Sequence, residues 1–174
     1  MSSTRHPLIR PVSLADAEAC RAVVDAVARE GRWLMAVEGF TVEATREFIR
    51  GNLEGGNIHV VAALDRDVVG WCDIVRAWPF DGFRDNGRLG MGLLAGWRGQ
   101  GLGRALASTA VQRAWDCGFR RIELEAFATN TPALGLYRAL GFVEEGRKRA
   151  VRLRHGVVED LVCMGLLRDE AAQA

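Results

Sequence analysis

The stretch Leu89-Gly-Met-Gly-Leu-Leu-Ala-Gly-Trp-Arg-Gly-Gln-Gly-Leu-Gly-Arg104 carries most of the structural information in this sequence. Its apolar start predicts a strand, and the glycine-rich turn after it opens a helix predicted over 101–117. The first N–H groups of a helix lack acceptors, and the helix dipole makes this end positive. Gly99, Gly101 and Gly103 let the backbone approach an anion closely, and Arg98 and Arg104 add charge. The stretch predicts a phosphate-binding loop, with a simple turn as the alternative.

Two common nucleotide-binding motifs do not fit this loop. The P-loop of nucleotide hydrolases requires Lys and then Ser or Thr after its last glycine, but Leu102 follows Gly101 here. The dinucleotide-binding fingerprint has the spacing GxGxxG, whereas the spacing here is GxGxG. A phosphate bound by this loop would therefore belong to another kind of ligand.

The rest of the chain predicts a mixed α/β fold in the order β-α-α-β-β-β-α-β-α-β-β, as one domain over residues 1–174. Loose ends are predicted at 1–6 and 169–174. The other predicted strands are 8–12, 58–64, 68–75, 122–128, 142–153 and 157–167. The other predicted helices are 14–30, a helix capped by Thr41 and ending near 53, and a helix from 132 to 141.

Composition excludes several classes of protein. The 174 residues carry 23 Lys and Arg against 22 Asp and Glu, which argues against a nucleic-acid partner. No apolar run approaches the ~18 residues of a membrane span, and residues 1–7 lack the apolar core of a secretory signal. The four cysteines form no CxxC pair, so we expect buried free thiols, no metal site and a cytoplasmic protein.

A second motif, Asn130-Thr-Pro-Ala-Leu-Gly-Leu-Tyr-Arg-Ala-Leu-Gly-Phe142, follows a predicted strand and covers a short helix. Asn130 stands where the strand ends, so its amide either binds an extended ligand or caps the helix. Tyr137 is the only tyrosine in the chain, and its phenol can donate a proton. An amphipathic tyrosine in the core is the alternative.

Together the two motifs resemble the GNAT superfamily of acetyl-CoA-dependent N-acetyltransferases. Arg98-x-x-Gly101-x-Gly103 is similar to its pyrophosphate loop, and Asn130 through Phe142 to its next motif, N-x-x-A-x-x-x-Y-x-x-x-G-F. The resemblance implies a mixed, mostly antiparallel sheet flanked by helices, acetyl-CoA as co-substrate, no metal and a small-molecule amine acceptor. The last hairpin resembles the bacterial branch that acts on amino acids and small amines. A homodimer through that hairpin is an open alternative.

The resemblance also implies roles for individual residues. Backbone groups of the segment at the end of the strand polarise the acetyl carbonyl, the loop holds the pyrophosphate, and Tyr137 protonates the leaving thiolate. The implied coenzyme-binding set is Leu93, Leu94, Ala95, Arg98, Gly99, Gln100, Gly101, Leu102, Gly103, Arg104, Asn130 and Tyr137.

The general base and the acceptor site are less defined. Many relatives carry a carboxylate just ahead of Leu89, where this chain has Arg88. Glu125 on the neighbouring strand is the first substitute, followed by Glu123, Asp85 and Glu38, with a chain of waters as the alternative. Arg88 either meets a substrate carboxylate or faces solvent. Trp33 and Trp78 either wall the acceptor site or pack beneath their loops.

The sequence therefore predicts transfer of an acetyl group from acetyl-CoA to the primary amine of an amino acid or other small molecule, by direct attack in a ternary complex. An acetyltransferase of protein N-termini is one alternative. A catalytically silent acyl-CoA-binding module is another; Arg88 favours it and Tyr137 argues against it.

Overall fold

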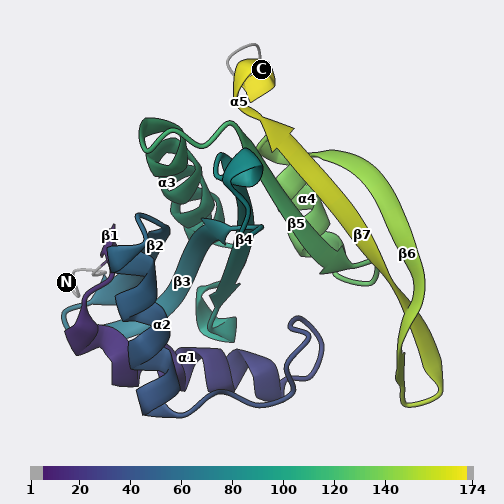
Figure 1. Cartoon of the computed structure of the whole chain (residues 1–174). Helices are drawn as coiled ribbons and strands as arrows, with labels where there is room; N and C mark the ends of the chain where they lie inside the picture. The colour runs from purple at the N-terminus through teal and green to yellow at the C-terminus, as the bar shows by residue number, and fades with distance from the viewer. Residues whose placement is uncertain (1–5, 172–174) are drawn as a thin grey trace.

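The computed structural model describes residues 6–171 (Figure 1). Residues 1–5 and 172–174 lie outside this range. They contain most of the two predicted loose ends and most of the segment that was expected to lack a secretory signal. The strands are β1 (Leu8–Pro11), β2 (Ile58–Leu64), β3 (Asp67–Arg76), β4 (Asn86–Leu93), β5 (Arg121–Phe127), β6 (Val143–Arg154) and β7 (Val157–Leu167). The helices are α1 (Ala17–Arg29), α2 (Val42–Glu54), α3 (Leu102–Asp116), α4 (Thr131–Ala139) and α5 (Arg168–Ala171), with short 3-10 turns η1 (Leu14–Asp16), η2 (Asp81–Phe83) and η3 (Ala95–Trp97).

The seven strands form one sheet in the order β1-β2-β3-β4-β5-β7-β6. All neighbours are antiparallel except β4 and β5, which are parallel. The predicted fold class and element order are confirmed. The C-terminal turn α5 was not predicted, because a short polar segment at a chain end has no periodicity to show.

The sheet splits between its two parallel strands. β4 and β5 pair only from Asn86↔Arg121 to Arg88↔Glu123. Beyond that point β4 stays with β3 as far as Leu93, and β5 stays with β7 as far as Phe127. Figure 1 shows the two strands diverging from this junction. Within residues 6–171, no strand therefore lies next to the backbone edge of β4 after Arg88 on the β5 side.

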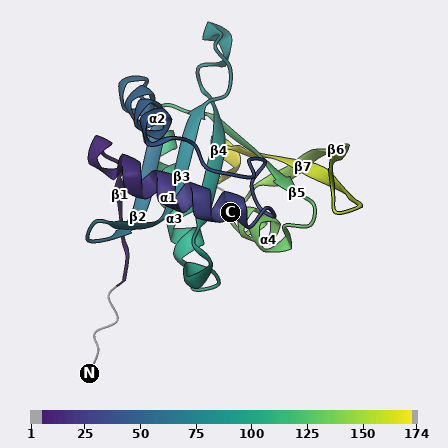
Figure 2. The ribbon, with the colours of Figure 1, turned by 90° about the horizontal axis from the view of Figure 1, so that it is seen from below.

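Each face of the sheet has its own apolar core. On one face α3 and α4 cover a large cluster that includes Cys72, Leu89, Leu124 and Tyr137. On the other face α1 and α2 cover a smaller cluster around Trp71. Figure 2, seen from below, shows α2 and α3 on opposite sides of the strands. Because alternate residues of a strand face opposite sides, Asp73, Gly90 and Glu125 lie on the α1–α2 side of the sheet.

The helix ends follow their capping residues. Thr41 Oγ1 accepts a hydrogen bond from the Ala44 N–H at 3.1 Å, which confirms the predicted cap of α2. Before α1, the Ser13 N–H donates to Asp16 Oδ2 at 2.8 Å. The Arg10 guanidinium, which also binds this carboxylate, lowers the pKa of Asp16 to about 2.

The cysteines follow the prediction in part. All four are free thiols, and Cys20 and Cys72 are buried as expected. Cys117 is exposed and Cys163 is half-buried, so the expectation of four buried thiols is wrong for these two. No helix within residues 6–171 is long and apolar enough to cross a membrane.

Candidate active site

The loop from Gly99 to Arg104 presents a row of unsatisfied donors. Gly99 and Gly101 have φ values of +72° and +82°, a left-handed conformation that favours glycine and turns successive N–H groups toward one side. Within residues 6–171, none of the backbone N–H groups from Gly99 to Arg104 donates to a protein acceptor. They lie at the start of α3, where the helix dipole adds positive potential. This arrangement suits a phosphate or another anion.

The Arg98 side chain does not point into that row of donors. Its guanidinium donates to both carboxylate oxygens of Glu30, at 2.7 and 2.6 Å, and to the Leu93 carbonyl. Trp33 donates to the same carboxylate, and the guanidinium carbon lies 5.6 Å from its ring centre. The Arg98 bonds are the main reason that the pKa of Glu30 is lowered. Arg98 thus connects the C-terminal end of α1 to the C-terminal end of β4.

The segment after β4 is partly engaged within the protein. The Leu94 N–H donates to the Val69 carbonyl at 3.0 Å, and the Ala95 carbonyl accepts from the Arg98 N–H at 3.3 Å. The predicted contacts of Leu93, Leu94 and Ala95 with a ligand are therefore restricted to their remaining backbone groups. Gln100 donates from its side chain to the Gly96 carbonyl at 2.8 Å and stabilises the turn.

Tyr137 lies against the same end of the sheet. A Cβ placed on Gly103, in the first turn of α3, would be 3.1 Å from Leu93 and 3.6 Å from Leu136, so the loop, β4 and α4 meet here. Tyr137 is buried beside Phe142, with 5.8 Å between ring centres. Burial, with the Cys72 thiol nearby, raises the pKa of Tyr137 well above its usual value. The phenol therefore remains protonated and can act as a donor.

Two other predicted coenzyme contacts have clear positions. Asn130 Oδ1 accepts a hydrogen bond from the Ala133 N–H at 3.3 Å. Of the two roles predicted for the Asn130 side chain, the structure displays the helix cap. Arg104 is exposed at the first turn of α3. Leu102 begins that helix and packs against the larger core.

The α1–α2 side of the split carries several charged groups. Arg88 binds Glu123 at 3.0 Å where the strands still pair. Its side chain is about half exposed, so of its two predicted roles the structure displays the one that faces solvent. Glu125, two residues further along β5, is half-buried and paired with Lys148. The structure thus places Glu125 at the split, already bound to a cation.

The two candidate tryptophans lie at opposite ends of β4. Trp33 is half-buried beside Arg98 at the end where the strands diverge. Trp78 stands in the β3–β4 loop, packed near Phe83 at 6.0 Å, and this loop precedes Asn86. Figure 1 shows η2 at one end of β4 and η3 at the other. With about 3.3 Å per residue, β4 separates Trp78 from the open end by roughly 20 Å, so the two do not share a site.

Sequence reasoning missed two buried polar residues that face each other across β2 and β3. His59 and Asp73 are register partners, exposed by 7% and 8%. Burial lowers the pKa of His59 to about 4; its Nδ1 lies 3.3 Å from the Asn52 amide nitrogen, and its Nε2 has no partner among the described residues. Burial raises the pKa of Asp73 to about 7. The sequence did contain one signal for Asp73, since it is an acidic residue inside the otherwise apolar run 68–75.

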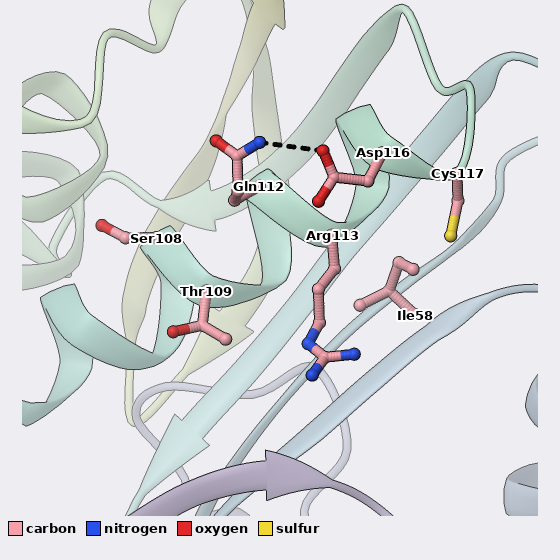
Figure 3. A pocket seen from close by; sticks show the side chains of 7 residues that line it. All are labelled: Ile58, Ser108, Thr109, Gln112, Arg113, Asp116 and Cys117. Atoms are coloured by element: carbon pink, nitrogen blue, oxygen red, sulfur yellow. Dashed lines mark hydrogen bonds between the residues drawn. The ribbon is translucent and has the colours of Figure 1, made fainter.

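A hollow between α3 and the start of β2 is a separate feature (Figure 3). It is lined by Ile58, Ser108, Thr109, Gln112, Arg113, Asp116 and Cys117. Gln112 bonds Asp116 at 3.0 Å along the helix, and the lining starts six residues beyond the first residue of α3. The hollow therefore does not include the N–H row or the split in the sheet.

A sequence profile of the Acetyltransferase (GNAT) family matches residues 26–142. Since this is more than half of the chain, the protein belongs to the GNAT family and is an N-acetyltransferase.

Three relatives illustrate the likeness. L-amino acid N-acyltransferase MnaT of Escherichia coli is 33% identical over 94 residues, which cover 54% of this chain and 55% of that protein. A ribosomal-protein-alanine N-acetyltransferase from Brucella melitensis superposes with a TM-score of 0.85 at 25% identity, covering 92% of this chain and 99% of that one. The structure of yncA from Salmonella typhimurium with acetyl-CoA has a TM-score of 0.88 at 22% identity, covering 96% of each chain, and shows the shared fold.

Proposed function

We propose that this protein transfers the acetyl group of acetyl-CoA to the primary amine of an amino acid or another small molecule. The observation that carries the proposal is the split between β4 and β5, with the unsatisfied N–H groups of Gly99–Arg104 at its open end. An extended coenzyme arm can lie along the unpaired edge of β4 while its pyrophosphate meets the loop. The acetyl-CoA in the yncA structure and the name of MnaT support this assignment.

The chemistry requires a neutral amine, a polarised carbonyl and a stabilised leaving group. The amine nitrogen forms a bond to the carbonyl carbon, the C–S bond breaks, and the coenzyme sulfur leaves as a thiolate. Tyr137, protonated because burial raises its pKa, donates its hydroxyl hydrogen toward that sulfur. Backbone N–H groups at the end of β4 stabilise the charge on the carbonyl oxygen.

The protons balance across the reaction. An acceptor ammonium loses one proton before attack, and the attacking nitrogen loses a second as the amide forms. Tyr137 gives one proton to the sulfur and regains one, which balances the second proton lost by the nitrogen. Each turnover therefore releases one proton to solvent. Glu125 was the first candidate for the group that removes the first of these protons.

The test combines binding and turnover. Isothermal calorimetry should detect acetyl-CoA binding to the purified protein, and thiol release should depend on a free amino acid or small amine. A peptide with a free N-terminus tests the alternative suggested by the Brucella relative. Turnover of the peptide alone would replace the small-molecule proposal. Binding without turnover of any amine would favour the silent module, and absent binding would refute both.

Two further predictions accompany the proposal. The β6–β7 hairpin exposes Val151, Leu153, Val157 and Val158, which supports a homodimer through this hairpin. Light scattering on the purified protein decides between monomer and dimer. A cytoplasmic location remains the prediction from sequence, and fractionation of cells that express the protein tests it.

A further inference from the structure

Asp73 lies where the sheet begins to split. Its register partner on β4 is Gly90, two residues beyond Arg88, the last residue of β4 that pairs with β5. A Cβ built on Gly90 would be 3.4 and 3.5 Å from the two carboxylate oxygens of Asp73. The carboxylate therefore reaches across from β3 and lies over the first glycine of the unpaired stretch.

Glycines keep this part of β4 free of side chains. Gly90 and Gly92 alternate with Met91, which points to the opposite face. The Trp71 ring covers Gly92, where an added Cβ would be 2.4 Å from it. Over Gly90 the nearest neighbour is the carboxylate itself. A molecule held at the unpaired edge of β4 therefore meets no β4 side chain between itself and Asp73.

The two faces of the split carry different chemical groups. Tyr137 belongs to the core cluster under α3 and α4, whereas Asp73 lies on the α1–α2 side. A thioester in the split would therefore have a proton donor on one face and a carboxylate on the other. This arrangement supplies a base for the attacking amine and an acid for the leaving thiolate on either side of the thioester.

We propose that Asp73 is the general base that takes the proton from the acceptor amine. This inference rests on the proposed acetyl-transfer function. The ammonium gives one proton to the Asp73 carboxylate, and its freed lone pair then forms the N–C bond as the C–S bond breaks. Asp73 returns the proton to solvent, which accounts for the one proton released in each turnover.

Glu125 is the competing candidate, and its surroundings differ. It is paired with Lys148 from the neighbouring hairpin. In the part of the chain that the structure describes, Asp73 forms no ion pair, and the Trp71 side chain offsets part of the rise that burial causes in the pKa of Asp73. An unpaired carboxylate has its oxygens available for an incoming ammonium, whereas a paired one must first exchange its partner.

The titratable groups around Asp73 leave it as the group that changes charge near neutral pH. His59 faces it from β2 and is neutral, because burial lowers its pKa to about 4. Arg88, on β4, is held by Glu123. From α1, the inward-facing Cys20 thiol has a pKa raised to about 12 by burial. Burial raises the pKa of Asp73 to about 7, close to the ~8 of an α-amine, which suits proton transfer between them.

The test compares Asp73→Asn with two matched variants. Asp67→Asn removes an exposed carboxylate from the same strand, and Glu125→Gln removes the competing base. Each protein is assayed for thiol release with acetyl-CoA and the amine that the wild type acetylates fastest. We expect Asp73→Asn to lower kcat by about 100-fold or more, with the acetyl-CoA dissociation constant unchanged by calorimetry. Asp67→Asn should match the wild type.

The pH profile separates a base from a structural residue. At saturating acceptor, wild-type kcat should rise with pH to a plateau with a midpoint near 7, and Asp73→Asn should lose this rise. If Asp73→Asn keeps wild-type kcat and profile, or if only Glu125→Gln removes the rise, Asp73 is not the base. If the wild type acetylates no amine at all, the proposed function fails and this inference fails with it.

Discussion

Replacing Asp73 by asparagine should stabilise the protein at pH 8 while it lowers activity. The wild-type carboxyl is 8% exposed, and burial raises its pKa from 3.8 to about 7. In the unfolded chain the same group titrates near 3.9. Between these values the folded protein binds one proton more than the unfolded chain, so the free energy of unfolding falls as pH rises from about 4 to 7. Above pH 7 this effect is complete.

The size of the effect follows from the pKa difference. A shift of about three units at 1.36 kcal/mol each corresponds to about 4 kcal/mol at pH 8. That is a large fraction of the 5–15 kcal/mol by which domains are commonly stable. Asparagine has nearly the shape of the protonated carboxyl and carries no charge at any pH. The free energy of unfolding of Asp73→Asn therefore does not fall through this group as the pH rises. The two proteins should be equally stable at pH 4 and differ by about 4 kcal/mol at pH 8.

Urea unfolding followed by tryptophan fluorescence measures this difference, since the chain has five tryptophans. Both proteins are unfolded at several pH values between 4 and 8, and only the difference between them is interpreted, because other carboxyls titrate in both. Asp67→Asn, which removes an exposed carboxyl, should show no such growing difference. A constant difference from pH 4 to 8, or a less stable Asp73→Asn at pH 8, would refute the reasoning.

Five other variants test the site. Tyr137→Phe should lower kcat about 100-fold without changing acetyl-CoA binding by calorimetry. Gly101→Ala, at a φ of +82°, should cost about 1–2 kcal/mol in urea unfolding and raise the KM for acetyl-CoA. Gly92→Ala should cost about 1–3 kcal/mol by overlap with an indole, whereas Gly90→Ala should leave stability intact and lower kcat/KM for the acceptor about tenfold or more. Glu30→Gln should cost about 1 kcal/mol, because its ion pair is 30% exposed.

The sequence allowed a correct prediction of the fold because its signals are local. Glycines at helix ends, the Thr41 cap and the apolar runs of the strands each act within a few residues, and together they determine the element order. The loop from Gly99 to Arg104 was predictable for the same reason, since both its turn and its helix start lie within one short stretch.

The parts of the site that were missed depend on contacts across the fold. Glu30 and Arg98 are 68 residues apart, and nothing local to either indicates that they bind each other. The side chain of Arg98 was expected to add charge for a phosphate, yet it joins α1 to β4 instead. The position of Trp78 follows from topology alone, because a loop that precedes β4 lies at the end of β4 opposite to the opening of the split.

The missing carboxylate before Leu89 and the buried carboxylate at Asp73 are best understood together. Arg88 neutralises Glu123 where β4 and β5 still pair, and this ion pair lies at the closed end of the split. One strand away, Asp73 has no cationic partner among residues 6–171, and Gly90 places no side chain over its carboxylate. A carboxylate buried without a cation costs stability, and the fold gains nothing structural from it that asparagine would not supply. Such a cost is expected at a position that the reaction requires, which is why the stability and activity of Asp73→Asn should change in opposite directions.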